Sequence, residues 1–201
     1  MATTALHDTT PQPRAIWRYN NVAVALHWSM ALLIVGQLWL GIYFHELPRG
    51  PARGELFTWH KTLGVLILAL TLARIAWRLT HRPPPYPAEM PHWERLIGVW
   101  NHRVFYFLML FMPLTGLALV SGPGRATTEL LGGIPFPTIP GLPESFEAGI
   151  EGAHKWGAVT WIGLIALHVA AALKHQFVDR AEGSGRMPPF VTRTKPTQVG
   201  Q

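Results

Sequence analysis

The sequence predicts an all-α fold, an integral membrane bundle of four helices, and three observations support this. Four segments are apolar over the roughly 20 residues that a helix needs to cross a bilayer. Only 14% of the residues are charged, against about 25% in typical soluble domains. The basic residues behind the net charge of +6 gather at the ends of the apolar segments. That distribution indicates membrane topology and not binding to nucleic acid.

The four predicted spans cover residues 22–44, 58–80, 99–121 and 154–177. The first span carries no formal charge, and the third contains Pro113, which we expect to kink it. The polar segments 1–20 and 181–201 are expected to be tails on a membrane domain over 21–180. The N-terminal tail lacks a charged, then apolar, cleavable pattern, so the first span is expected to be an uncleaved anchor.

Two connections differ in character. Residues 82–94 are rich in proline and are expected to be extended, whereas 122–153, rich in glycine and proline, form the longest connection. The stretch PESFEAGIEGA at the end of the longer loop is expected to form a short amphipathic helix.

The distribution of basic residues predicts the orientation. Twelve of the 17 Lys and Arg residues fall on the side of both termini and the 81–98 loop, and five fall on the other side. By the positive-inside rule, both termini lie in the cytoplasm, as in a multi-pass protein of the bacterial inner membrane. Aromatic residues near the span ends fit an interfacial belt: Trp17, Tyr19, Trp59, Trp77, Trp93 and Trp156.

Histidines inside the spans are costly and are therefore functional candidates. His154 and His168 are fourteen residues apart in the fourth span, which corresponds to about 21 Å along a helix and a rotation to within about 40° of the same direction. Two stacked sites at opposite membrane depths follow. Depth alone pairs His168 with His27 on the cytoplasmic half, and His154 with His60 on the periplasmic half.

Two imidazoles on opposite sides of an iron suit haem, and a six-coordinate iron passes electrons more readily than it binds oxygen. The chain has no Cys, which excludes disulfides, thiolate iron–sulfur sites and covalent c-type haem. The four histidines therefore predict two b-type haems. A single histidine in a span would more often be a packing residue, and zinc usually takes more ligands at one depth, including Cys or carboxylates.

Two glycines lie near these histidines in the sequence. Gly64 follows His60 by four residues and Gly157 follows His154 by three. They would either allow a haem to approach closely or serve helix–helix packing.

The sequence resembles the bacterial cytochrome b561 family over about residues 17 to 180. The resemblance rests on ALHWSMALLI (His27), TWHKTLGVLILAL followed by ARIAWR (His60), NHRVFYFLMLFMPLTGLAL (His102), AHKWGAVTWIGLIALHVAAALKHQF (His154, His168, His175) and, in the outer loop, LLGGIPFPTIP. It implies a four-helix bundle with two b haems, ligated at His27, His60, His154 and His168. It also implies electron exchange with quinone and, in one branch, oxidation of superoxide to oxygen with ubiquinone as acceptor.

Further candidates lie near the predicted cytoplasmic haem. His175 follows His168 by seven residues, and His102 opens the third span on the same side. Both are candidates for bonding a quinone carbonyl and relaying protons, since imidazole titrates near neutral pH. Lys174 is a further candidate for binding quinone or a propionate. His102 is also a candidate propionate or packing contact. The alternative is that these are interfacial residues bonded to water or lipid.

Basic residues near both predicted haems are candidates as well. Arg74 and Arg78 would bind haem propionates, because guanidinium matches carboxylate geometry, or would be plain surface charges. Lys61 and Lys155 each follow an outer histidine directly. They would bind outer propionates or attract an anionic reductant such as superoxide, or would simply be interface lysines.

The sequence leaves three hypotheses for function. The first is a superoxide:ubiquinone oxidoreductase. The second is a membrane-anchor subunit that passes electrons between the quinone pool and a periplasmic redox partner, and the acidic residues of the long loop fit a basic partner: Glu129, Glu144, Glu147 and Glu151. The third is a membrane protein with structural histidines and no haem.

Overall fold

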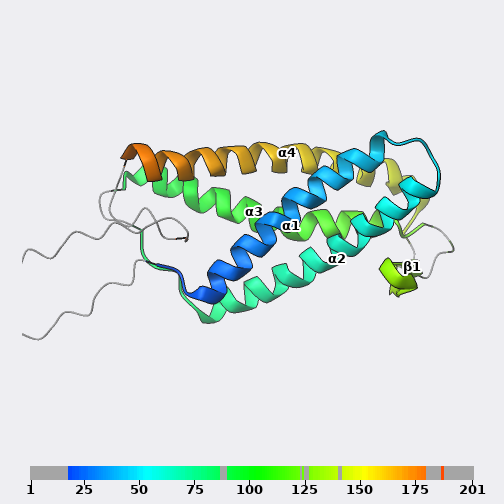
Figure 1. Cartoon of the computed structure of the whole chain (residues 1–201), viewed down its shortest axis with the longest axis horizontal. Coiled ribbons are helices and arrows are strands. Elements are labelled where there is room, and N and C mark those ends of the chain that lie inside the picture. The colour runs from blue at the N-terminus through cyan, green and yellow to red at the C-terminus, as the bar shows by residue number, and fades with distance from the viewer. Residues whose placement is uncertain are drawn as a thin grey trace, which may run out of the picture.

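Four long helices dominate the computed structural model, which describes residues 18–86, 90–122, 124, 127–139, 142–179 and 187. They are α1 (Asn21–Glu46), α2 (Pro51–Thr80), α3 (His92–Leu119) and α4 (Glu147–Leu173), and they run along one another in a bundle (Figure 1). Each is long and apolar enough to cross a membrane. The prediction of an all-α bundle with four spans is therefore confirmed.

The two ends of the bundle are named here by the predicted topology. The inner end is where α1 and α3 begin and where α2 and α4 end, and the outer end is the opposite one (Figure 1). Helix packing pairs α1 with α2, α2 with α3, and α3 with α4.

The helices extend beyond the predicted spans. α2 begins at Pro51 and α3 at His92, whereas the predicted spans begin at 58 and 99. A span predicted from hydropathy ends where charged residues begin, whereas the helix itself extends through those charged turns to a capping residue or a proline. Pro51 supplies that boundary in the first turn of α2, and Pro91 is the N-cap of α3. α3 runs through Pro113 as one helix.

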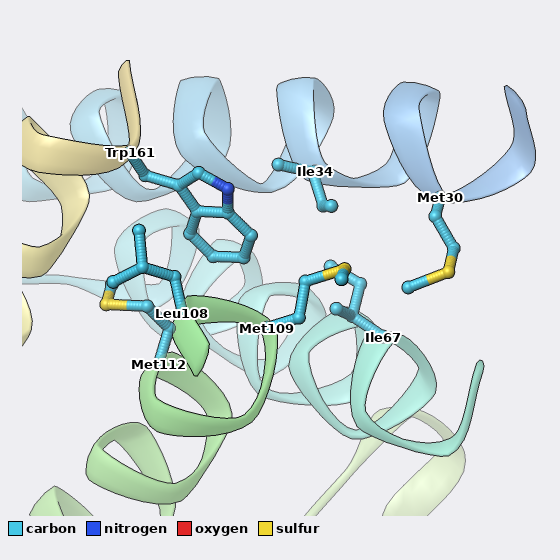
Figure 2. Packing of buried hydrophobic residues seen from close by; sticks show 7 residues of the cluster. All are labelled: Met30, Ile34, Ile67, Leu108, Met109, Met112 and Trp161. Atoms are coloured by element: carbon cyan, nitrogen blue, oxygen red, sulfur yellow. The ribbon is translucent and has the colours of Figure 1, made fainter. Parts of the chain in front are cut away.

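A cluster of buried apolar side chains fills the middle of the bundle (Figure 2). Its members come from all four helices: Met30, Ile34, Ile67, Leu108, Met109, Met112 and Trp161. Trp161 lies seven residues from both His154 and His168 on α4. The cluster therefore separates the levels of the two histidine sites.

The outer surface of the bundle is also apolar. Leu32, Val35 and Trp39 on α1 are 74%, 56% and 62% exposed. Water disfavours so many exposed apolar side chains, whereas lipid accommodates them. These faces therefore fit contact with the bilayer.

The outer loop contains a small β-hairpin that the sequence analysis did not predict. β1 (Thr127–Glu129) pairs antiparallel with β2 (Pro135–Pro137) around a 3-10 turn, η1 (Leu131–Gly133). Three hydrogen bonds tie this segment to the bundle: Lys61 Nζ donates to Thr128 Oγ1 (3.0 Å), the Leu131 N–H donates to Thr62 Oγ1 (2.9 Å), and the Ile139 N–H donates to Ser121 Oγ (2.9 Å).

The segment before the fourth span differs from the prediction. A 3-10 turn, η2 (Glu144–Phe146), leads directly into α4 at Glu147, so the connection is shorter than 122–153. The predicted amphipathic helix is therefore this turn and the first turns of α4. At its other end, α4 passes into a π-helical segment, η3 (Lys174–Asp179).

Candidate functional site

The outer pair of histidines joins α2 to α4. The ring centroids of His60 and His154 are 6.4 Å apart, with their planes at 74°. The Thr115 hydroxyl lies 2.9 Å from His154 Nδ1 and within 3.0 Å of two backbone carbonyls of its own helix. Its one hydrogen is donated to a carbonyl, so the oxygen accepts the Nδ1–H of His154. That assignment leaves Nε2 of His154 free to bind a metal.

The inner pair joins α1 to α4. The ring centroids of His27 and His168 are 6.2 Å apart, with their planes at 58°. The side-chain nitrogen of Asn101 lies 3.5 Å from His168 Nδ1, while its oxygen is buried with no partner among the described residues. With the amide nitrogen and oxygen of Asn101 exchanged, the oxygen accepts the Nδ1–H of His168. Nε2 of His168 is then free as well.

A third ring stands beside the inner pair. The ring centroid of His102 is 5.7 Å from that of His168. Nδ1 of His102 donates to the carbonyl of Gly98, one turn earlier on α3, at 2.6 Å. His102 Nε2 therefore remains available for another partner.

The spacing of both pairs fits one metal between two imidazoles. A metal–imidazole bond is about 2 Å and the ring centre lies about 1 Å beyond the nitrogen, so two such rings across one metal have centres about 6 Å apart. The observed 6.2 and 6.4 Å match this value. Over the described residues, no group of three or more His, Asp or Glu side chains is arranged to hold a metal. Two imidazoles per site match the ligand set of a six-coordinate haem iron.

The glycines beside the outer histidines are not the two that the sequence suggested. A Cβ on Gly41 would lie 3.1 Å from His60 Cε1, and one on Gly116 would lie 3.4 Å from His154 Cε1. A Cβ on Gly64 would instead meet Gln37 Nε2 at 3.5 Å. A Cβ on Gly157 would meet Met112 Sδ at 2.5 Å. Gly64 and Gly157 therefore face neighbouring helices, in line with the packing alternative.

Arg74 and Arg78 both lie against Tyr106 of α3. Arg74 Nε donates to the Tyr106 hydroxyl at 3.2 Å, and the Arg78 guanidinium lies 5.8 Å from the Tyr106 ring centroid. Arg74 Nη1 is buried and has no acceptor among the described residues. Such a buried cationic donor indicates a place for a carboxylate.

The two outer lysines have different surroundings. Lys155 forms an ion pair with Glu151 at 2.6 Å, and both side chains are more than half exposed. Lys61 donates to Thr128 of the hairpin and lies 5.2 Å from the Phe57 ring centroid. The Lys155 charge is therefore offset locally by an adjacent carboxylate.

The remaining inner candidates meet at Glu94, in the first turn of α3. Lys174 Nζ lies 3.0 Å from one Glu94 oxygen, and His175 Nδ1 lies 3.9 Å from the other. The Glu94 side chain is only 12% exposed. The structure thus divides the inner candidates into a set around Glu94, a set around Tyr106, and His102 beside His168.

Sequence reasoning missed several residues of these sites. Glu94, Asn101, Tyr106 and Thr115 are ordinary polar positions in the sequence, and only the packing of α3 on its neighbours brings them to the histidines and arginines. The stretch NHRVFYF contains Asn101 and Tyr106, but spacing along one helix does not show which residues face another helix.

Known proteins resemble this chain over most of its length. A sequence model of the family described as prokaryotic cytochrome b561 matches residues 18–188. Cytochrome b561 homolog 2 of Escherichia coli K12 is 28% identical over 183 residues, covering 85% of this chain and 90% of that protein. Cytochrome b561 homolog 1 of the same strain is 27% identical over 176 residues, covering 86% and 97%. A probable superoxide oxidase, CybB of Yersinia pestis, is 28% identical over 177 residues, covering 86% and 96%.

Proposed function

Because the chain belongs to the prokaryotic cytochrome b561 family, a family of electron-transfer proteins that bind b-type haem, we propose that it holds two such haems and passes electrons across the membrane. We further propose that superoxide is oxidised at the outer, periplasmic end and that ubiquinone is reduced at the inner, cytoplasmic end. The hypothesis of a membrane protein without redox function does not fit this family.

The observation that supports two haems most directly is the pair of ring spacings. His27 and His168 would hold the inner haem, and His60 and His154 the outer one. Thr115 and Asn101 would fix the orientation of two of these rings by accepting their Nδ1–H groups. When bound, each haem supplies one-electron redox chemistry.

Arg74 and Arg78 would hold the propionates of the inner haem. The buried Nη1 of Arg74 lacks an acceptor among the described residues, and Tyr106 fixes the guanidinium from the other side. Binding two carboxylates at two guanidiniums would satisfy these donors and orient the haem.

Oxidation of superoxide needs no proton at the outer end. Each superoxide anion loses one electron and leaves as O₂, so two of them reduce one quinone. The local charge supports this in part, since Lys61 lies at the outer pair and can attract an anion. The pairing of Lys155 with Glu151 removes much of the field that Lys155 would otherwise add.

Reduction of a quinone requires two electrons and two protons, and the inner end holds groups that can carry protons. His102 has a free Nε2 beside His168, which would bond a quinone carbonyl. His175 and Lys174 stand at the Glu94 carboxylate and would relay protons from the cytoplasm.

The alternative is a membrane-anchor subunit that passes electrons between the quinone pool and a periplasmic redox partner. One observation favours it: Glu129, Glu144 and Glu147 are all exposed at the outer end. These carboxylates would attract a basic protein partner and weakly repel superoxide.

Haem counting followed by a superoxide pulse tests the proposal. The purified protein is expected to bind two b-type haems per chain, His154→Ala one, and the control His92→Ala, at an exposed position, two. A pulse of superoxide should reduce the haem spectrum rapidly, and added ubiquinone should reverse that reduction. Two haems that ignore superoxide but accept electrons from a quinol would support the anchor subunit instead, and absence of haem would contradict the ligand assignment.

A further inference from the structure

A cavity of about 490 Å³ opens at the inner end, between the start of α1 and the end of α2. Arg18, Tyr19 and Asn20 line it from just before α1, and residues 81–85 line it from just after α2. Both segments adjoin the ends of spans (Figure 1). The mouth of the cavity therefore lies at the level of the lipid headgroups.

The walls of this cavity carry a strong positive charge. Four guanidiniums line it, from Arg18, Arg74, Arg78 and Arg82, and none of the described lining residues is acidic. Planar, permanently charged guanidinium groups are the preferred partners of carboxylates and phosphates. The charge of the lining therefore favours anionic ligands in this cavity.

The proposed function uses only part of that charge. Arg74 and Arg78 lie at Tyr106, and the proposed function assigns them to the two propionates of one haem. Arg18 and Arg82 lie at the rim, and both are exposed. Arg18 is already oriented, because its Nη2 donates to Asn21 Oδ1 at 3.0 Å. Two guanidiniums thus remain at the rim for a second anion.

We propose that this rim, formed by Arg18 and Arg82, binds the phosphate group of an anionic phospholipid from the inner leaflet. Basic pockets between membrane helices on the cytoplasmic side are suited to such headgroups. Below the rim, Ala23 and Leu26 of α1 offer apolar walls against which the glycerol and upper acyl chain would pack. The site is separate from the histidine pairs, although its charge count rests on the propionate assignment.

Lipid binding to the detergent-solubilised, delipidated holoprotein, measured by native mass spectrometry, tests this proposal. Phosphatidylglycerol is expected to bind about tenfold more tightly than phosphatidylcholine, whose cationic headgroup offsets its phosphate. The double variant R18Q/R82Q should lose about a hundredfold in affinity for phosphatidylglycerol, because each substitution removes a hydrogen bond to a charged group that is worth about tenfold. R82Q alone should show a smaller loss.

A matched control comes from the same end of the bundle. Arg103 lies on α3 over the Trp100 ring (5.0 Å) and outside the cavity, so R103Q removes an equal charge and should leave lipid affinity unchanged. Equal losses in R103Q and R82Q would overturn the proposal, because general surface charge would then explain binding.

Two further arms separate the ligand sources and the two proposals. Inorganic phosphate that displaces phosphatidylglycerol at equal concentration would show that the site takes free phosphate and would overturn the lipid assignment. Haem content is read in every sample. The rim variants are expected to lose lipid affinity and to keep two haems per chain, which would assign Arg18 and Arg82 to lipid alone. A loss of haem in these variants would show that the two arginines serve the inner haem, and it would overturn their assignment to lipid.

Discussion

At the residue level, the proposed ligand histidines are held by side chains that accept their second ring hydrogen. Thr115 does so for His154, and Asn101 does so for His168 once its amide is oriented to pair. A partner on Nδ1 fixes both the tautomer and the ring orientation. The ring orientation of one histidine in each pair therefore depends on α3, although α3 contributes no histidine to either pair.

We predict that Thr115→Val weakens haem retention at the outer site about 10- to 100-fold, the usual effect of losing a partner of a metal ligand. The isosteric change keeps the volume and removes the acceptor of the His154 Nδ1–H. Transfer of haem to excess apomyoglobin measures the effect. Thr160→Val, at an exposed position on α4, is the control and should retain haem like the wild type. Equal transfer rates in the two variants would contradict the role of Thr115.

The candidate histidines themselves could be found from the sequence, because period and depth place them without knowledge of the neighbours. Their partners could not. Thr115 and Asn101 matter through contacts between helices, and the rotation of α3 against α4 is set by packing of side chains such as Met112 against Gly157. Gly41 and Gly116 were missed for the same reason, since each lies on a different helix from the histidine that it faces.

At the level of whole elements, apolar length predicted the four helices and underestimated their ends. Arg53, Glu55, Glu94 and Arg95 lie in helical turns outside the apolar windows. The hairpin had no sequence signal strong enough to predict, because its three-residue strands contain two prolines, Pro135 and Pro137. Its position depends on hydrogen bonds to Lys61, Thr62 and Ser121 of the bundle.

α1 offers a matched pair of glycines for testing close approach at the outer site. Gly41→Ala would place a methyl group 3.1 Å from the His60 ring, whereas Gly36 has nothing within 4 Å of the same added carbon. We predict that Gly41→Ala lowers outer haem occupancy, so that haem per chain falls below two. Gly36→Ala should keep both haems and stabilise the helix by up to about 1 kcal/mol.

Spectroscopic haem counting and thermal unfolding distinguish these two glycine variants. Full haem occupancy in Gly41→Ala, with unchanged electron paramagnetic resonance of the outer haem, would show that the His60 ring can shift without cost and would contradict the prediction.

At the level of the whole molecule, the bundle is polarised. The inner end carries the arginine-lined cavity and the Glu94 cluster, and the outer end carries the hairpin and exposed carboxylates. Charge along the chain predicts which end faces the cytoplasm, since basic residues stay on that side.

The absence of Cys from the chain makes orientation directly measurable. We predict that a single cysteine at the outer turn, Ser145→Cys, is labelled by a membrane-impermeant maleimide in intact cells with a permeabilised outer membrane. A single cysteine at the inner end, Thr80→Cys, should be labelled only after the inner membrane is lysed. The reverse pattern would place the proposed quinone end outside and contradict the direction of electron flow.

α4 supplies one histidine to each pair, with Trp161 between them, and it is the last of the four helices along the chain. This order has a consequence for biogenesis. During synthesis α1 and α2 enter the membrane carrying His27 and His60, each without its counterpart. In the proposed ligand set both sites are completed only when α4 inserts, so a chain that stops before α4 is expected to bind neither haem.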